Sequence, residues 1–285
     1  DVEAYFIIDS EYLALRLMPN ELDLVKLYIA DFPLEGRTKP RARDEFIRLF
    51  NQGALILTYL GHGNPTVLAH ESMFLVSRDL GAIENGGRLP FFYTAASQIG
   101  VFDDPARISM PEALLKKENG GVIGMISATR VGYHNSNMIL ANQFHEQMYQ
   151  TNRKAPPVGQ AFMEAKQLVL ALFNNSDLAF RNMQRYSIFG DPATRLAVPR
   201  FQVQISVADS LSALGEVEVE GQVLDMSGKP AAGYQGQVWL QAFDSSARSR
   251  LDGFNYNQVG AHIFRGRFPV VDGRFGAEFR VPKDI

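Results

Sequence analysis

Two continuous runs of apolar and β-branched residues mark the first half of the chain, at residues 54–60 and 89–95. Strands that are covered on both faces have unbroken apolar sequences of this kind. Each run is followed at once by small residues and one reactive side chain, His62 after the first and Ser97 after the second. Ligands of open parallel α/β sheets sit beyond the carboxyl ends of the strands. We therefore expect His62 and Ser97 to face one crevice if the two strands are neighbours.

Strand and helix patterns alternate through the rest of the first 198 residues. A third buried strand is predicted at 122–128, and short strands are predicted at 5–8 and 24–29. Apolar residues at helical spacing, with caps and stops at the ends, predict helices at residues 12–17, 41–51, 110–117, 138–149 and 159–173. This alternation indicates an α/β domain over residues 1–198, with a mainly parallel sheet between helical layers.

The pattern changes after Pro199, where no helical periodicity is found. Short alternating or apolar runs are separated by turns that contain glycine and proline. These runs predict strands at residues 201–207, 216–224, 235–243, 262–267 and 274–281. Short strands with regular turns are typical of a β-sandwich, so we expect an immunoglobulin-like β domain over residues 199–285.

Composition narrows the function classes. A chain of 285 residues is long enough for two domains. The net charge of -3 gives no reason to expect a nucleic acid or an anionic membrane as partner, and no apolar run approaches the length of a membrane span. With no cysteine, the chain has neither a disulfide framework nor a thiol site.

The two ends of the chain favour a fragment of a longer protein. The acidic start, Asp1-Val2-Glu3, lacks the basic residues of a signal peptide, and the sequence stops at Ile285 within an apparent strand. We therefore expect the α/β domain to be truncated at its N-terminal side and the β domain to be incomplete at its C-terminal side.

His62 stands between Gly61 and Gly63 at the end of a predicted strand. Flanking glycines permit unusual backbone dihedral angles and a close approach of a substrate backbone, which suits a general base next to an oxyanion-binding amide. The alternative is a turn whose histidine points to solvent. A nucleophile at Ser97 would complete a dyad with this base.

Several segments resemble the gingipain family of cysteine peptidases. The resemblance is carried by residues 58–63, 94–105, 120–124, 127–131 and 189–196, in the same order along the chain. It is closer still to the gingipain-like sortases (signal peptidases) of the bacterial type IX secretion system, which residues 280–285 also resemble. It covers most of the chain from about residue 50. The resemblance implies a caspase-like α/β fold followed by an immunoglobulin-like domain.

The resemblance also implies roles for particular residues. His62 would be the catalytic base and acid, and residue 97 the nucleophile. Gly63 and the amide of Ser97 would hold the oxyanion. The loop with Thr129, Arg130 and Tyr133 would wall a substrate pocket, although a packed turn with a solvated Arg130 is the alternative.

The function implied by the resemblance is that of a peptidase core of a type IX sortase. Such an enzyme removes the C-terminal signal domain of secreted cargo and passes the acyl group to a lipopolysaccharide amine. The expected partners are cargo proteins or peptides and other components of the secretion system. The expected location is the bacterial cell surface, on the outer side of the outer membrane.

The sequence departs from the family at the nucleophile, because Ser97 stands where a cysteine belongs. A thiol can lose its proton to a nearby histidine, whereas a serine needs a histidine oriented by a carboxylate. Candidates for that carboxylate are Glu71, Asp103 and Asp104. Ser97 is then an engineered replacement, a natural loss that leaves a cargo-binding or scaffold pseudoenzyme, or a working nucleophile. An unrelated α/β hydrolase lacks support, because no Gly-x-Ser-x-Gly elbow occurs.

One metal site is a candidate. Gingipains bind structural calcium, and Asp103 and Asp104 offer carboxylates, although an Asp-Asp-Pro run is more often a turn. No other cofactor is expected. His70, His134 and His145 do not have the spacing of metal ligands.

Overall fold

The structure is a computed structural model, and it describes residues 3–19, 21–149, 155–174, 176–208 and 210–284. The chain divides into two compact units. The first comprises the residues up to Met18 and Leu27–Val198, and the second comprises Pro19–Lys26 and Pro199–Ile285. Residues 19–26 were expected in the first domain but group with the second unit, where Gln202 Nε2 donates a hydrogen bond to Glu21 Oε1 at 2.8 Å.

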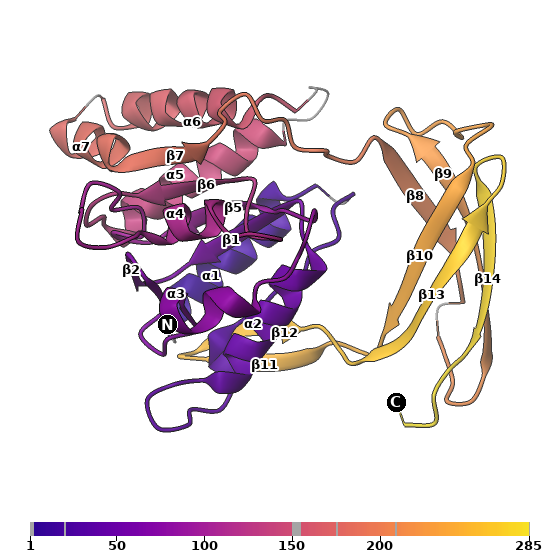
Figure 1. The fold of residues 1–285 in the computed structure, drawn as a ribbon. Helices are drawn as coiled ribbons and strands as arrows, with labels where there is room; N and C mark the ends of the chain where they lie inside the picture. The colour runs from indigo at the N-terminus through magenta and orange to yellow at the C-terminus, as the bar shows by residue number, and fades with distance from the viewer. Residues whose placement is uncertain (1–2, 20, 150–154, 175, 209, 285) are drawn as a thin grey trace. The chain divides into compact units, whose positions relative to one another are not determined.

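A four-stranded sheet forms the centre of the first unit (Figure 1). Its order is β1-β5-β6-β7, with the strands at Ile56–Leu60, Phe91–Ala95, Gly124–Ala128 and Tyr186–Gly190. The first three strands are parallel, and β7 pairs antiparallel with β6 at the edge. The prediction of a mainly parallel sheet, with the three apolar runs as strands, is confirmed.

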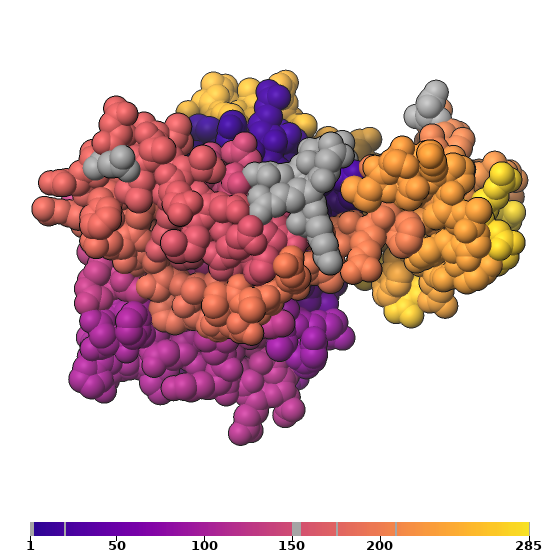
Figure 2. Space-filling view, turned by 90° about the horizontal axis from the view of Figure 1, so that it is seen from above, coloured from indigo at the N-terminus to yellow at the C-terminus, as the bar shows by residue number. Residues whose placement is uncertain are grey.

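Helices cover both faces of this sheet. Alternate residues of a strand point to opposite faces, and in β5 both sets of side chains are apolar and need cover. Phe91 and Tyr93 belong to one apolar cluster, and Phe92 to the other. The first cluster is completed by α5 (His134–Met148), α6 (Val158–Leu172) and α7 (Asp177–Arg185). The second is completed by α2 (Pro40–Gln52) and α4 (Met110–Leu115). Figure 2 shows α6, α7 and β7, salmon to orange, on one face of this unit.

The predicted strand at residues 5–8 is wrong. This segment lies in α1 (Ala4–Tyr12), which continues as a π-helical turn over Leu13–Leu17. A short apolar run does not distinguish a strand from a buried helix segment. The residues expected to cap a following helix lie inside α1, where the Ser10 hydroxyl donates back to the carbonyl oxygen of Phe6 at 2.7 Å.

The predicted strand at residues 24–29 is also wrong, since only a 3₁₀ turn at Ile29–Asp31 is formed there. Helix α7 and strand β7 were not predicted as such. Short elements complete the unit: β2 (Gly63–Asn64), β3 (Val67–Leu68), β4 (Phe74–Leu75), α3 (Val76–Asp79) and a 3₁₀ turn at Leu80–Ala82. Strands β2, β3 and β4 form a small antiparallel sheet. No helix in the described part of the chain is both long enough and apolar enough to span a bilayer.

The second unit is built from antiparallel strands. One sheet has the order β14-β9-β8, and the other pairs β10 with β13. Their bounds are Phe201–Ser206 (β8), Glu216–Asp225 (β9), Gly236–Phe243 (β10), His262–Val270 (β13) and Arg274–Arg280 (β14). Val219 and Phe279 of one sheet share an apolar cluster with Leu240 and Phe264 of the other. The immunoglobulin-like classification of this unit stays a prediction.

A separate hairpin of β11 (Ala247–Leu251) and β12 (Phe254–Gln258) also belongs to the second unit. Its two-residue loop has positive φ angles at both positions, 47° at Asp252 and 88° at Gly253. Such a loop matches the right-handed twist of the two strands, and Asp-Gly is a preferred pair for it. This hairpin was not predicted, although its turn signal is present in the sequence.

Candidate active site

The register of the sheet places His62 and Ser97 at the same edge. Leu60 at the end of β1 pairs with Ala95 at the end of the neighbouring parallel strand β5. His62 and Ser97 each follow two residues beyond this pair, so both leave the sheet at its carboxyl end. This is the edge at which α/β proteins bind their ligands.

The loops that carry these two residues are also in contact. A Cβ atom added to Gly63 would lie 2.5 Å from the Cδ1 atom of Ile99, which is closer than side-chain atoms tolerate. Glycine at position 63 therefore permits a close approach to the segment that follows Ser97, and a larger residue there would displace the Ile99 side chain. Gly63 begins β2 and pairs with Leu68 of β3.

Three side chains surround the imidazole of His62. Its Nδ1 atom lies 4.0 Å from Glu3 Oε1, and its ring lies edge-on to Phe6 with 5.2 Å between centroids. The ring of His70 stacks on it at 4.5 Å. The carbonyl oxygen of His62 accepts hydrogen bonds from the Tyr59 hydroxyl (2.7 Å) and from the amide of Ala69 (3.0 Å). The backbone is thereby fixed while the imidazole stays 39% exposed.

Glu3 is the carboxylate that sequence reasoning missed. It comes just before α1, and no local pattern in the sequence links it to a histidine so far along the chain. The three acidic residues named as candidates have other interactions. Asp103 pairs with Arg130 and Asp104 with Arg107, whereas Glu71 acts on Tyr59, where its charge adds to burial in raising the pKa of that phenol.

The hydroxyl of Ser97 is held by the loop that follows β6. It donates to the carbonyl oxygen of Gly132 and accepts from the amide of the same residue, both at 3.1 Å. The next residue, Gln98, has a φ of 60°, a left-handed conformation that costs a non-glycine residue on the order of 1 kcal/mol. Its amide donates to the carbonyl oxygen of Arg130 at 3.2 Å. The turn after β5 is therefore strained and is fixed from both sides.

The loop over residues 129–133 contacts Arg185, the last residue of helix α7. The amide and the hydroxyl of Thr129 both donate to the carbonyl oxygen of Arg185, at 2.6 and 2.9 Å. Tyr133 is 58% exposed, and the guanidinium of Arg185 lies 5.8 Å from the centre of its ring. Arg130 is not simply solvated, because its Nη1 and Nη2 atoms donate hydrogen bonds to the two carboxylate oxygens of Asp103, at 3.0 and 2.5 Å.

The two aspartates named for calcium do not fit a cation site. The Arg130 guanidinium holds the pKa of the Asp103 carboxyl below its ordinary value, and Asp104 receives the Arg107 guanidinium at 2.6 Å. Calcium requires six to eight oxygen ligands, whereas these oxygens face positive charges. In the described ranges, the group of ligand atoms close enough to hold a metal ion is that of Glu3, His62 and His70, within 4.8 Å of one another.

A cavity of about 430 Å³ adjoins the 129–133 loop. Its lining includes Arg130 and, from α7, Arg181 and Arg185. The α7 arginines were not predicted, although a pair of basic residues four positions apart on one helical face is visible in the sequence. Arg185 Nη1 is buried without a hydrogen-bond partner among the described residues. Leaving a buried donor unsatisfied costs about 1–3 kcal/mol.

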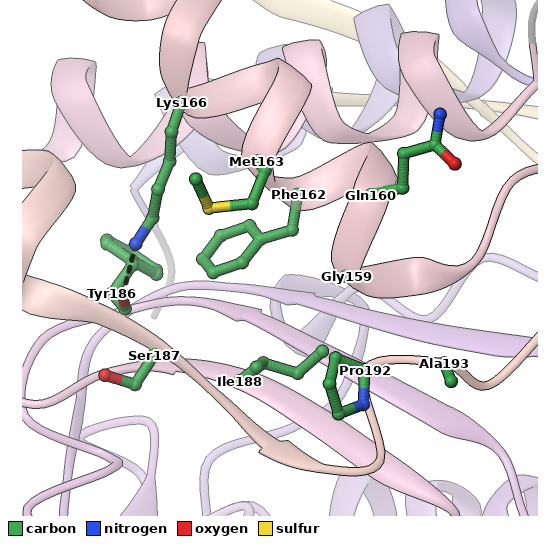
Figure 3. Close-up of a pocket in the computed structure, with 10 residues that line it drawn as sticks. All are labelled: Gly159, Gln160, Phe162, Met163, Lys166, Tyr186, Ser187, Ile188, Pro192 and Ala193. Atoms are coloured by element: carbon green, nitrogen blue, oxygen red, sulfur yellow. Dashed lines mark hydrogen bonds between the residues drawn. The ribbon is translucent and has the colours of Figure 1, made fainter.

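A second cavity, of about 720 Å³, is larger than the one beside the 129–133 loop but holds none of the predicted site residues. It lies between α6 and β7 and is mostly apolar (Figure 3). Its lining includes Lys166, which donates to the carbonyl oxygen of Tyr186 at 2.7 Å and whose pKa is lowered by burial to about 8. Volume alone therefore does not identify the site.

The fold and the sequence together place the chain in a known family. The arrangement is that of a mixed α/β protein, with a candidate base and a candidate nucleophile on adjacent strand ends. The model of peptidase family C25 matches residues 9–197, which is more than half of the chain. The chain therefore belongs to peptidase family C25, the gingipain family, and the predicted resemblance is confirmed.

Among solved structures, the chain is similar to the Arg-specific cysteine proteinase gingipain R (RgpB), with 20% identity, a TM-score of 0.50 and coverage of 88% of this chain and 50% of that one. It also matches a complex of Porphyromonas gingivalis RgpB pro- and mature domains (20%, TM-score 0.49, 88% and 52% covered). A third match is dimeric latent PorU from Porphyromonas gingivalis (24%, TM-score 0.30, 58% and 17% covered).

The gingipain R match supports the gingipain-like fold. The chain spans about half the length of the gingipain structures that it matches. Among curated proteins, no significant match was found.

Proposed function

We propose that the carboxyl-end edge of the sheet is a peptide-processing site of the gingipain type, in the peptidase core of a type IX secretion sortase. The observation that carries this proposal is the pairing of Leu60 with Ala95, which sends His62 and residue 97 off the same sheet edge. The family membership supports a cysteine peptidase ancestry for this pair of positions.

The chemistry follows from the roles of the two side chains. A nucleophile at position 97 would attack the peptide carbonyl while His62 accepts its proton. The amides of Gly63 and residue 97 would stabilise the oxyanion. His62 would then give the proton to the leaving amine, and the acyl group would pass to water or to an acceptor amine. Glu3, 4.0 Å from His62 Nδ1, would orient the imidazole.

The proposed substrate is the C-terminal signal domain of secreted cargo, with a lipopolysaccharide amine as acceptor. The proposed place of action is the outer face of the bacterial cell surface. The second unit is proposed as an immunoglobulin-like domain that accompanies the peptidase core, as in the gingipain family.

A second candidate function is a pseudoenzyme that binds cargo peptides without cleaving them. One observation favours it: both hydrogen bonds of the Ser97 hydroxyl go to the backbone of Gly132, so its proton points to a carbonyl oxygen. A serine hydroxyl also cannot form the ion pair with histidine that activates a cysteine thiol.

The test restores the thiol. Because the chain has no cysteine, the variant Ser97→Cys carries a single reactive sulfur. We expect a peptidyl acyloxymethyl ketone to label it, with labelling followed by intact-protein mass spectrometry. The variant Ser97→Cys/His62→Ala should label at least tenfold more slowly, since the thiolate loses its partner.

A matched control places the thiol at an exposed serine of the second unit, Ser212→Cys, and measures intrinsic thiol reactivity. Labelling of Ser97→Cys no faster than this control, or equally fast without His62, would overturn the proposed site. The unmodified chain is treated with a fluorophosphonate in parallel. Stable labelling at Ser97 would establish a working serine nucleophile and reject the pseudoenzyme.

A further inference from the structure

The cavity of about 430 Å³ beside the 129–133 loop is lined by several positively charged side chains. Three guanidinium groups, those of Arg130, Arg181 and Arg185, line it together with one carboxylate, that of Asp103. Asp103 is already engaged by Arg130 through a two-pronged contact. The positive charge of the two α7 arginines is therefore not balanced within the cavity.

Arg185 is the unusual member of this set. Its Nη1 atom is buried and has no hydrogen-bond partner among the described residues. Its aromatic neighbour Tyr133, at 5.8 Å, offers the face of a ring but no oxygen acceptor from that face. A charged group withdrawn from water is retained where an anionic acceptor completes its hydrogen bonds.

The cavity is joined to the candidate nucleophile through the backbone. The amide of Gln98 donates to the carbonyl oxygen of Arg130, and Ser97 exchanges two hydrogen bonds with Gly132. Tyr133, which lies over Arg185, is the next residue in the chain. The loop that holds the Ser97 hydroxyl therefore also borders this cavity.

We propose that this cavity binds a carboxylate of the peptide that occupies the site, with Arg185 as the main contact and Arg181 in support. The planar guanidinium matches the two oxygens of a carboxylate in a bidentate pair. This inference rests on the proposed function of the sheet edge as a peptide site. The carboxylate can come from an acidic side chain or from the C-terminus of a peptide.

The test measures binding rather than turnover, so that it does not depend on the state of residue 97. Fluorescent heptapeptides with acetylated and amidated ends carry Glu or Gln at one position in a neutral background, and a third set carries Gln and a free C-terminus. Binding to the unmodified chain is followed by fluorescence anisotropy at low and at high salt. We expect at least one position at which Glu binds about tenfold more tightly than Gln, with the preference reduced by salt.

Variants assign the preference to the cavity. Arg185→Met keeps the apolar stem and should abolish the preference for Glu, whereas Arg181→Gln, at an exposed position, should reduce it about threefold. Arg48→Gln is the matched control, since Arg48 is a helical arginine paired with Glu45 outside the cavity. Far-UV circular dichroism verifies that each variant is folded, and Arg181→Gln keeps the test informative if Arg185→Met does not fold.

The outcomes separate this inference from the proposed function. A preference for Glu, or for the free C-terminus, that disappears in Arg185→Met supports the cavity and identifies the source of the carboxylate. His62-dependent labelling of Ser97→Cys together with equal binding of Glu and Gln peptides would overturn the cavity and leave the peptidase site standing. An Arg185-dependent preference without such labelling would keep the cavity and reject the peptidase site. A preference that is lost equally in Arg48→Gln would overturn the assignment to the cavity.

Discussion

Strand β1 contacts two histidines whose surroundings contrast. His62 follows the strand in the edge loops, 39% exposed and within 4.0 Å of the Glu3 carboxylate. His145 of α5 lies beneath the sheet, fully buried, with its Nε2 atom 3.1 Å from the hydroxyl of Thr58 in the same strand. Burial lowers the pKa of His145 to about 3, so this imidazole stays neutral. The exposed His62 beside a carboxylate suits proton transfer, whereas the buried and neutral His145 suits packing.

The difference shows how the first unit separates stability from chemistry. Beneath α5, aromatic rings pack on the sheet, and Phe144 lies 5.1 Å from Tyr93 between ring centroids. At the edge, backbone hydrogen bonds position small or polar residues such as Ser97 and Gly132. Changes in the interior should therefore alter the free energy of unfolding, and changes at the edge should alter reactivity and binding.

The largest expected effect comes from Phe144→Ala. Phe144 is completely buried, and removing its ring should lower the free energy of unfolding by about 3–5 kcal/mol. Denaturant unfolding followed by far-UV circular dichroism measures this, because the described helices all lie in the first unit. The matched control is Phe180→Ala, at a position 51% exposed on α7, with an expected loss below about 0.5 kcal/mol. Similar losses in both variants would contradict the contrast between interior and surface.

A smaller effect is expected from the protonation of His145. Its pKa is about 3 in the folded chain and about 6.5 when unfolded, so the unfolded chain takes up the proton first as the pH falls. The stability contributed by the neutral imidazole is present above pH 6.5 and is lost progressively as the pH falls from 6.5 towards 3. Between pH 6.5 and pH 5 the loss should be about 1–2 kcal/mol.

Unfolding curves of His145→Gln at several pH values measure this contribution. The variant should lose less stability than the unmodified chain over the same pH range. His262→Gln, which changes an exposed histidine of β13, is the control and should keep the loss of stability that comes from His145. A pH dependence that is the same with and without His145 would show that its burial does not act on stability.

Much of the sheet could be predicted because unbroken apolar runs encode β1, β5 and β6 directly. The helix α1 could not, since Phe6 and Ile7 are buried while Tyr5 and Ile8 are exposed, a pattern too short to fix a period. Strand β7 and helix α7 were missed because their apolar signal is short. Their positions follow from pairing with β6 and packing on α5, which are long-range contacts.

The residues of the candidate site also fall into those that the local sequence predicts and those that tertiary contacts bring in. His62 and Ser97 were predicted because each directly follows an apolar strand, and the family resemblance named them. Glu3 and Arg185 were missed because tertiary contacts alone bring them to these loops. Gly63 was predicted for its backbone freedom, and the structure adds its close approach to Ile99.

The most direct test of the account is the pH dependence of alkylation of the thiol in Ser97→Cys by iodoacetamide. A free cysteine has a pKa of about 8.5. We expect a midpoint below pH 8 for this variant, a rise of at least about one pH unit when His62→Ala is added, and a smaller rise with Glu3→Gln. A midpoint near 8.5 that is the same with and without His62 would show that the two residues do not share one cleft.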